Sequence, residues 1–564
     1  METQVKKIKL TIKKPTINLL HSQPEHVDKI LNILDKSPIA LDLSMLGTGK
    51  TYTSSYIAQI KKYTHVIVIC PLSMKGKWEM MKTDHGVPIY DIYTYCGLRS
   101  SKCRQPKHGL LHRRDYQVSN YDNARHITIR VDKVEFNVTD EYKRLINEGT
   151  LLIIDEIQNI KNLGSQFLAC QALLKYISSQ FEETQAQTQT ANDAGSVARS
   201  AMSRAILLSG SPIDKEEQVV HFFRLIDLMK TDSLSEYNPY TEVNVWQGFK
   251  HISDFMMATN QAKTSMINYL VVNTGKSKEF ISITYKLFQK VYKPVYSSAM
   301  PPFISNFKID KLNAFYECAP TSIALLKKGT DLLAKAVNYD PDRGTIMFER
   351  GGSFSYIQQA MIMIETSKIG TIIRIAREKL SSNPKMKMII CVNYIDTITD
   401  LNICLSDMNP LVLTGSVSDR NRRRLLEEFQ QPNTNRRLLI ANTAVCGAGI
   451  DLDDQHGDYP RFCLVNPNYS TIMLYQVCHR IYRKNTMSDS VVHFLYMKEH
   501  CELRILEALA RKSAIMKETT SEQSDISGIK FPCDFEGLVE NELDGLDAKI
   551  REYYEKLDRP FKNL

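Results

Sequence analysis

Residues 44–51 read Ser44-Met45-Leu46-Gly47-Thr48-Gly49-Lys50-Thr51, between an apolar run at 39–43 and a helical pattern at 53–60. A strand, a glycine-rich turn that ends in Gly-Lys-Thr, and a helix together predict a phosphate-binding loop. Glycines let backbone N–H groups converge on an anion, and the helix N-terminus adds positive potential. The stretch therefore predicts a nucleotide-binding α/β domain, with residues 44–51 as contacts to the nucleotide.

Two side chains of this loop carry most of its predicted chemistry. Lys50 supplies a positive charge for the β- and γ-phosphates, and Thr51 supplies a hydroxyl ligand for Mg²⁺. Ser44 departs from the full pattern, which has glycine six residues before the lysine. The alternative interpretation is a surface turn that contains two glycines by chance.

A second signal lies at residues 151–158, Leu-Leu-Ile-Ile-Asp-Glu-Ile-Gln. An apolar run here delivers two carboxylates to the end of a predicted strand. Beside a phosphate-binding loop, Asp155 would hold Mg²⁺ and Glu156 would polarise the attacking water. Such a pair also occurs by chance, and its place after the Gly-Lys-Thr loop in the same α/β pattern favours the catalytic interpretation.

Composition sets the class of protein. The chain has 564 residues, 43% hydrophobic and 24% charged, with a formal net charge of +9. This length predicts about two to four domains, and the mild basic excess permits a nucleic-acid partner. None of the 12 cysteines forms a Cys-x-x-Cys pair, which favours reduced thiols over zinc or disulfides. No stretch is long and apolar enough to span a bilayer, so we expect a soluble intracellular protein without a membrane partner.

Other stretches suggest a phosphate-backbone surface. The predicted strand 65–70 is followed by Ser73 and Lys75, which suit contacts to nucleic-acid phosphates, although basic residues in a first helical turn are often only solvated. The basic segment 99–114 is predicted to be irregular, either facing nucleic acid or forming a solvated insert. Residues 180–200 are rich in Gln, Thr and Ala and predict a flexible insertion.

A further strand is predicted at 205–208, and the α/β rhythm is lost from about residue 236 and returns near residue 363. A helix is predicted over 476–483, where Arg480 and Arg483 would share one face. Arginine suits the charge on a transferring γ-phosphoryl group, so a site between two domains is expected. Taken alone, the two arginines fit a salt-bridged surface helix better than a catalytic pair. The predicted regions are a basic N-terminal arm at 1–17, an ATP-binding domain at 18–235, a helical linking region at 236–362, a second α/β domain at 363–498 and a helical tail at 499–564.

The order and spacing of these motifs resemble superfamily-two helicases of the Swi/Snf-type branch. Within that branch the chain is similar to the helicase-like nucleoside triphosphatases of nucleocytoplasmic large DNA viruses. The resemblance covers about residues 18–230 and 363–498 and rests on these matches: Gln23 at the adenine side; Gly47, Gly49, Lys50 and Thr51 in motif I; Pro71 and Ser73 in Ia; 155–158 in II; 209–212 in III; Asn393, Tyr394, Thr414 and Gly415 at IV and its successor; Thr443, Gly447, Gly449 and Asp451 in V; Gln476, Arg480 and Arg483 in VI.

The resemblance implies two tandem RecA-like domains with parallel sheets, with ATP and Mg²⁺ in the cleft between them. It implies a catalytic set of Lys50, Asp155, Glu156, Gln158, Arg480 and Arg483. Further nucleotide contacts are Gln23, Gly449, Asp451 and Gln476. Magnesium ligands are Thr51 and Asp155. Contacts to nucleic acid are Ser73, Lys75, Asn393, Thr414 and Thr443.

Three motifs depart from the pattern usual in the branch. Motif I reads Ser-Met-Leu-Gly-Thr-Gly at 44–49, where the branch usually has Asp-Glu-Met-Gly-Leu-Gly. Gln158 stands where motif II usually ends in His, and His479 replaces a glycine before Arg480. None of them removes an essential charge.

The predicted function is an ATP-dependent nucleic-acid motor, either a helicase or a duplex translocase. The resemblance further implies viral transcription or replication, a viral RNA polymerase or transcription complex as partner, and a viral factory, virion or host nucleus as compartment. The alternative is an ATP-gated scaffold with weak turnover and no strand separation.

Overall fold

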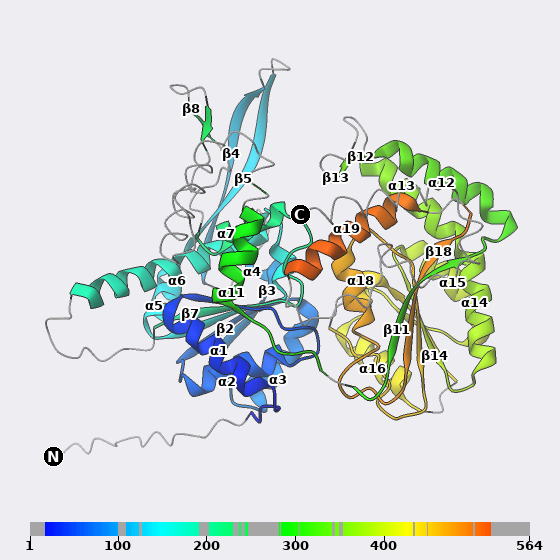
Figure 1. Cartoon of the computed structure of the whole chain (residues 1–564), viewed down its shortest axis with the longest axis horizontal. Coiled ribbons are helices and arrows are strands. Elements are labelled where there is room, and N and C mark those ends of the chain that lie inside the picture. The colour runs from blue at the N-terminus through cyan, green and yellow to red at the C-terminus, as the bar shows by residue number, and fades with distance from the viewer. Residues whose placement is uncertain are drawn as a thin grey trace. The chain divides into compact units, whose positions relative to one another are not determined.

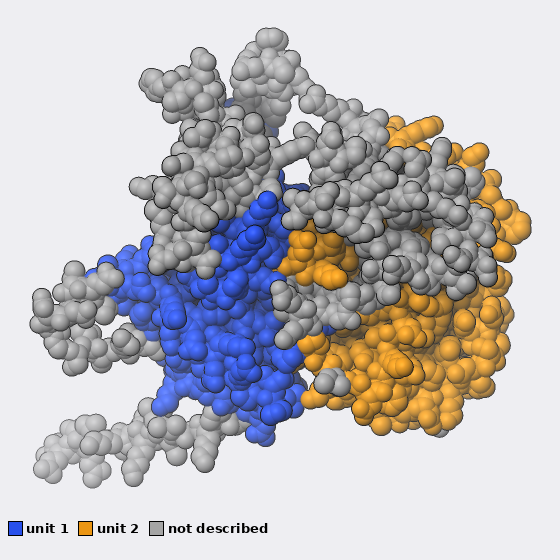
Figure 2. Space-filling view, in the orientation of Figure 1, with its two compact units in different colours: residues 1–45, 49–212, 216–301 blue, residues 46–48, 213–215, 302–564 orange. Residues whose placement is uncertain are grey.

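The computed structural model divides the chain into two compact units (Figure 2). Unit 1 comprises residues 1–45, 49–212 and 216–301, and unit 2 comprises 46–48, 213–215 and 302–564. The residues that the structure describes are 17–99, 109–122, 127–190, 202–228, 236–238, 243–245, 281, 284–303, 305–340, 345–348, 354–432, 435–447, 449–499 and 502–519. Within them, no helix has the length and apolar character needed to cross a membrane.

Unit 1 contains a six-stranded parallel sheet in the order β10-β1-β7-β6-β2-β3 (Figure 1). Its strands are β1 (Ile39–Asp42), β2 (His65–Cys70), β3 (Ile89–Thr94), β6 (Thr150–Asp155), β7 (Arg204–Leu208) and β10 (Ser297–Ser298). β1, β6 and β7 are buried along their whole length, as expected for parallel strands covered on both faces.

Helices cover both faces of this sheet. The described helices are α1 (Gln23–Lys36), α2 (Lys50–Ile60), α3 (Lys75–Thr83), α4 (Tyr95–Arg99), α5 (Asp140–Asn147), α6 (Ser165–Thr190), α7 (Glu217–Leu225) and α11 (Lys293–Tyr296), with a π-helical turn at Phe288–Tyr292. In Figure 1, α1, α2 and α3 lie on one side of the sheet, and α4 to α7 lie on the other. Thr139 caps α5 because its hydroxyl accepts a hydrogen bond from the N–H of Tyr142.

Unit 1 also carries an antiparallel hairpin of β4 (Leu111–Asp122) and β5 (Ile127–Val138). The sequence analysis assigned Arg113 and Arg114 to an irregular basic segment, and that assignment is wrong for these residues. Both lie on β4, where Arg113 is buried and forms an ion pair with Asp115. The short strands β8 (Glu236–Asn238) and β9 (Val243–Val245) form a separate antiparallel pair.

The predicted flexible insertion at 180–200 is also wrong for its first half. α6 continues to Thr190, so residues 180–190 are helical. Leu173, Ile177 and Phe181 on this helix are buried, and these contacts extend the helix into the polar stretch. Residues 191–200 lie outside the described ranges.

Unit 2 contains a second six-stranded parallel sheet, in the order β11-β18-β17-β14-β16-β15. Its strands are β11 (Ile309–Tyr316), β14 (Lys387–Val392), β15 (Leu411–Leu413), β16 (Leu438–Asn442), β17 (Arg461–Val465) and β18 (Ser490–Met497), and a separate pair is formed by β12 (Val337–Asp340) and β13 (Thr345–Phe348). The described helices are α12 (Ile323–Ala336), α13 (Phe354–Ser367), α14 (Ile369–Ser382), α15 (Ile395–Cys404), α16 (Asp419–Gln430), α17 (Thr443–Cys446), α18 (Thr471–Cys478) and α19 (Leu503–Thr519).

Two parallel sheets with helices on their faces agree with the predicted pair of RecA-like domains. The segment that the sequence analysis assigned to a linking region contributes a strand to each sheet. β10 pairs with β1 in unit 1, and β11 pairs with β18 from Ile309 to Tyr316 in unit 2. The chain therefore passes from an edge strand of one sheet to an edge strand of the other through residues 299–308.

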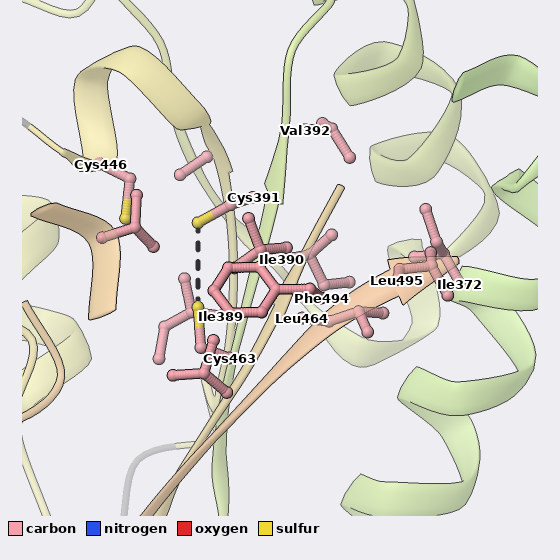
Figure 3. Packing of buried hydrophobic residues seen from close by; sticks show 14 of the residues in the cluster. Ile372, Ile389, Ile390, Cys391, Val392, Cys446, Cys463, Leu464, Phe494 and Leu495 are labelled. Carbon is pink, nitrogen blue, oxygen red and sulfur yellow. Dashed lines mark hydrogen bonds between the residues drawn. The ribbon is translucent and has the colours of Figure 1, made fainter. Parts of the chain in front are cut away.

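The core of unit 2 is apolar and rich in thiols. Figure 3 shows Cys391 and Cys463 facing each other beside Leu464 and Phe494, with the two sulfur atoms 4.0 Å apart. Every cysteine within the described ranges is free. Burial raises the pKa of Cys478 to about 12, so that thiol stays neutral at physiological pH.

The C-terminal helix α19 belongs to this core. Leu506, Leu509 and Met516 are buried in the same cluster as the strands of the unit 2 sheet. This packing agrees with the predicted helical pattern at the start of the tail. The rest of the predicted helical tail, from residue 520 onward, lies outside the described ranges.

We expect Leu509→Ala to lower the free energy of unfolding by about 2–5 kcal/mol, because it removes a fully buried side chain and leaves a cavity. Urea unfolding followed by far-ultraviolet circular dichroism measures this change. The matched control is Ile403→Ala, whose side chain is 64% exposed, and its effect should stay within about 0.5 kcal/mol. Equal effects of the two substitutions would contradict the packing of α19 on the sheet.

Candidate nucleotide site and polar edge of the second sheet

Strand order places three motifs at one edge of the unit 1 sheet. β7 lies between β1 and β6, and all three strands run in parallel. The glycine-rich loop follows β1, the acidic pair ends β6, and Ser209 follows β7. The carboxyl ends of parallel strands share one edge, where ligands of open α/β sheets bind. Residues far apart in the sequence are therefore brought together by pairing.

The glycine-rich loop has the backbone that its sequence predicts. Gly47 has φ +84° and Gly49 has φ +100°, a region that side chains with a Cβ rarely adopt. A Cβ on Gly49 would lie 2.3 Å from Nε2 of Gln23, so glycine is required there for a second reason. The same contact places Gln23, predicted from a distant stretch, against the loop.

Lys50 is buried at the first position of α2. Its ammonium donates hydrogen bonds to the carbonyl oxygens of Ser44 at 2.8 Å and Met45 at 3.0 Å. The carboxylate of Asp42 accepts a hydrogen bond from the N–H of Ser44 at 2.9 Å. The pKa of Asp42 is lowered, because the favourable effects of His26, Lys50 and Ser44 outweigh burial, the largest single contribution.

Asp155 is fixed from two sides. The indole of Trp78 donates to its Oδ2 at 2.9 Å, and the hydroxyl of Tyr95 donates to its backbone carbonyl at 2.7 Å. Burial, followed by the neighbouring charge of Glu156, raises the pKa of Asp155 to about 6. Both aromatic partners follow the ends of neighbouring strands, and the sequence analysis gave neither a role. Tyr95 directly follows β3, and Trp78 lies on α3, the helix after β2, and these positions were the available signal.

Glu156, Gln158 and Ser209 form a hydrogen-bonded chain. The side-chain amide of Gln158 donates to the carboxylate of Glu156 at 2.5 Å, and its carbonyl oxygen accepts from the hydroxyl of Ser209 at 2.7 Å. Ser209 also accepts from the N–H of Ser211 at 3.0 Å. Glu156 itself has φ +60°, a rare value for a residue with a side chain. Gln158 thus connects the acidic pair to the motif that follows β7.

Ser73 and Lys75 lie where the sequence predicts, at the end of β2. Ser73 belongs to the short 3-10 helix Leu72–Met74, and Lys75 begins α3. Both side chains are partly exposed, and Lys75 lies 3.9 Å from Glu79 in a loose ion pair. Such a pair contributes little, because both groups remain solvated.

In unit 2 the ends of β14 and β17 surround a buried carboxylate. Glu365 accepts hydrogen bonds from the backbone N–H and side-chain amide of Asn393, both at 2.8 Å. It also accepts from the N–H of Tyr394 at 2.9 Å and the amide of Asn466 at 2.6 Å. Four N–H donors on one carboxylate compensate for its complete burial.

The side chain of Asn393, a predicted contact to nucleic acid, is used within the protein. Its Oδ1 accepts from Asn468 at 2.8 Å, in addition to the bonds with Glu365. Its backbone carbonyl accepts from Asn442 at 2.9 Å. Asn442 in turn caps α17, the helix that begins at Thr443. The geometry therefore gives Asn393 a structural part in positioning the next motif.

The network extends to the C-terminal tail through Lys368, which is buried. Its ammonium donates to Asn466 Oδ1 at 2.8 Å and to the carbonyl of Leu495 at 2.9 Å, and it pairs with the buried carboxylate of Glu502. Glu502 immediately precedes α19. The tail is thus joined to the same polar edge that carries Asn393.

The two remaining predicted contacts to nucleic acid, Thr414 and Thr443, are both buried and differ in their hydrogen bonding. Thr414 is largely buried, and its hydroxyl lies 2.9 Å from that of Ser416. Thr443 is fully buried, and its hydroxyl makes no hydrogen bond. An unsatisfied hydroxyl at a predicted binding motif is noteworthy because buried hydroxyls normally have a partner.

The predicted helix through Arg483 is wrong. α18 ends at Cys478, so Arg480 and Arg483 lie in the irregular segment that follows and do not share a helical face. The chain turns here because Arg480 is bonded to the preceding motif. Its guanidinium donates two hydrogen bonds to the carbonyl of Gly447, at 2.6 and 3.1 Å, and its own carbonyl accepts from Leu452.

The other residues of motifs V and VI gather around this turn. Arg483 pairs with Asp451 at 2.8 Å, so two predicted site residues neutralise each other within unit 2. Gly449 has φ +64°, and a Cβ on Gly447 would lie 3.6 Å from Oε1 of Gln476. The structure therefore brings motifs V and VI together, although by a different local geometry from the predicted helix.

Comparisons with known proteins agree with this organisation. Residues 367–485 match the model of the helicase conserved C-terminal domain. The chain is 22% identical over 517 residues to a protein of Acanthamoeba polyphaga mimivirus, named as a candidate ATP-dependent RNA helicase, and the match covers 90% of this chain and 84% of the relative.

Two solved structures of the Sulfolobus solfataricus SWI2/SNF2 ATPase core, one of them in complex with dsDNA, are also similar. They share 16% and 15% identity, cover 92% and 91% of this chain and 97% and 92% of their own, and have TM-scores of 0.26 and 0.27. Scores this low do not establish a shared fold, so the fold assignment rests on the strand order of each unit. The matched helicase C-terminal domain and the mimivirus relative make the chain similar to helicases, in agreement with the resemblance of its ordered motifs to superfamily two.

Proposed function

We propose that the protein is a motor that couples ATP hydrolysis to movement along a nucleic acid, with a role in viral transcription or replication. The observation that carries the proposal is the chain Glu156–Gln158–Ser209 beside the glycine-rich loop, at one edge of the unit 1 sheet. It supplies a carboxylate suited to activating water and a route from that carboxylate to a neighbouring strand.

The residues of this edge fit ATP and Mg²⁺ by their chemistry. The hydroxyl of Thr51 and the carboxylate of Asp155 are the oxygen ligands that Mg²⁺ prefers, and the ion would offset charge on the phosphates. Lys50 would exchange the carbonyls of Ser44 and Met45 for phosphate oxygens. Glu156 would orient and deprotonate the attacking water, while Gln158 fixes the direction of its carboxylate.

Arg480 and Arg483 belong to unit 2, whereas the phosphate loop follows β1 of unit 1. We propose that either arginine serves the γ-phosphoryl group only when the two domains close on ATP. Release of products would let them open, which converts hydrolysis into motion. For Arg483 this requires exchange of the Asp451 carboxylate for phosphate.

Nucleic acid would contact the strand ends of both domains, chiefly at phosphates and without sequence preference. Ser73, Lys75, Thr414 and Thr443 are the proposed contacts. Asn393 acts here as a positioning residue, because Glu365 and Asn468 already occupy its side chain. The mimivirus relative is named as an RNA helicase, whereas the motif resemblance favours a duplex as the substrate. The experiment below therefore includes both RNA and duplex DNA. A viral polymerase or transcription complex is the proposed partner.

The decisive experiment is steady-state ATP hydrolysis without nucleic acid and with single-stranded DNA, duplex DNA or RNA. Stimulation by one of them identifies the track, and a strand-displacement assay on a forked substrate then separates helicase from translocase activity. A low rate that no nucleic acid changes, with ATP still bound, would replace the motor by the ATP-gated scaffold.

Lys50→Ala and Glu156→Gln should each reduce kcat by about 100-fold or more, because the first removes the phosphate charge and the second removes the base. The readout is phosphate release with saturating nucleic acid. Matched controls are Lys61→Ala at the end of α2 and Glu148→Gln after α5, whose side chains are solvent-exposed. Near-normal hydrolysis by Lys50→Ala would end the ATPase proposal.

Gln158→Leu should lower kcat about 10-fold or more, because it keeps the size of the side chain but removes both hydrogen bonds that join Glu156 to Ser209. Gln158→His should retain most of the activity, since one ring nitrogen donates and the other accepts. The comparison of the two variants checks the relay. Equal kcat values for Gln158→Leu and Gln158→His would show that the hydrogen bonds of Gln158 with Glu156 and Ser209 have no part in catalysis.

Glu365→Gln should weaken nucleic-acid binding about 5- to 10-fold, because an amide donor would face the N–H groups that the carboxylate now accepts. Fluorescence anisotropy with a labelled oligonucleotide measures this affinity. Glu378→Gln on α14, an exposed position, is the control. Unchanged affinity with an intact melting temperature would separate the network from the nucleic-acid surface.

A further inference from the structure

Ser44 departs from both the general phosphate-loop pattern and the motif usual in this branch, and the structure gives its hydroxyl a specific partner. The side chain is fully buried and accepts a hydrogen bond from the backbone N–H of Met300 at 2.9 Å. Glycine or alanine at this position would leave that N–H without its acceptor. The serine at position 44 therefore connects the phosphate loop to a segment 256 residues later in the sequence.

The partner segment belongs to the edge of the unit 1 sheet. β10 pairs with β1 at Leu41 and Asp42, and the N–H of Leu43 donates to the carbonyl of Ser298 at 2.8 Å. Met300 follows two residues after that strand. Because β11 of unit 2 begins at Ile309, Met300 stands at the start of the chain that connects the units.

A buried pair supports the same junction from behind. His26 Nε2 lies 3.1 Å from Asp42 Oδ2, and His26 Nδ1 lies 2.9 Å from the hydroxyl of Ser298. His26 and Asp42 are each only 2% exposed in their side chains. The second oxygen of Asp42 accepts from the N–H of Ser44. His26 is one helical turn after Gln23, so the adenine-side helix, the phosphate loop and β10 share one network.

The ammonium of Lys50 connects this network to the nucleotide position. In the structure it is bonded to the carbonyls of Ser44 and Met45. A bound γ-phosphate would compete for that ammonium and release both carbonyls. Ser44 would then lose one of its contacts, and its hydroxyl, which also interacts with the carboxylate of Asp42, would pass a shift on to the N–H of Met300.

We propose that Ser44 is a positioning residue that transmits occupancy of the phosphate loop to the start of the inter-unit connection through its hydrogen bond with Met300. The inference rests on the proposed ATPase function and adds a regulatory path to it. His26 and Asp42 join β10 to the residue before the loop, so a shift of Ser44 acts on the same hydrogen-bonded network that holds β10. Coupling of hydrolysis to the connection thus begins at a residue that the general motif does not contain.

Hydrogen exchange measured by mass spectrometry on the full chain tests the path directly. The peptide that contains Met300 should exchange at a different rate when a non-hydrolysable ATP analogue is bound to the wild type. In Ser44→Ala the amide should exchange faster without nucleotide, and the analogue should no longer change it. A Met300 amide that is insensitive to the analogue in the wild type overturns the proposal.

Kinetics supply a second readout. Ser44→Ala should lower kcat in saturating nucleic acid by about 5- to 10-fold, with a change in KM for ATP of less than about 2-fold. The matched control is Ser55→Ala on α2, because this hydroxyl is equally buried but has no hydrogen-bond partner. Ser55→Ala should resemble the wild type. Equal behaviour of the two variants, while ATP is still hydrolysed, refutes the path and leaves the ATPase proposal intact.

Met300→Pro removes the same hydrogen bond from the other side and keeps the proposal testable should Ser44→Ala fold poorly. Its kcat should fall to a similar extent, and the double variant with Ser44→Ala should be no slower than either single variant. Additive losses would show that the two residues act separately. If the wild-type protein did not bind ATP, the result would instead contradict the proposed function.

Discussion

Hydrogen bonding between β1, β7 and β6 is the constraint on which the nucleotide site depends. The three strands are in parallel register, from Ile39 opposite Ala205 to Asp155 opposite Leu208. This register sets the distance between the phosphate loop, Ser209 and the acidic pair, because each follows its strand directly. Slippage by one residue would reverse the faces of a buried strand. The apolar core that fixes the register therefore also fixes the geometry of the site.

Parallel strand pairing also arranges the polar loops of the unit 2 sheet, but the outcome there is different. Its neighbouring strands also deliver polar loops to one edge, yet there the side chains satisfy one another around Glu365 and Lys368. A buried carboxylate and a buried ammonium are tolerated because each is surrounded by hydrogen-bond partners. The result is a rigid support that includes Glu502 of the tail. Arg480 and Arg483 are likewise engaged within their own unit, by Gly447 and Asp451.

Sequence alone determined the local features. Parallel strands buried on both faces read as continuous apolar runs, so β2 was predicted at its observed bounds and β1, β6 and β7 to within about two residues. The glycines of the phosphate loop were readable because their backbone angles exclude other residues. Predictions from local sequence were wrong where tertiary packing sets the end of a helix. α6 continues through a polar stretch, and α18 ends at Cys478 in a turn.

Only the tertiary structure decided which distant residues meet. No periodicity connects Trp78 to Asp155, Ser44 to Met300 or Asn393 to Glu365, because these contacts arise from strand order and from crossovers between strands. Sequence patterns report the face that a residue presents and the end of a strand where it lies. They do not report the neighbour on the adjacent strand, since pairing between distant strands is selected by the free energy of the whole core.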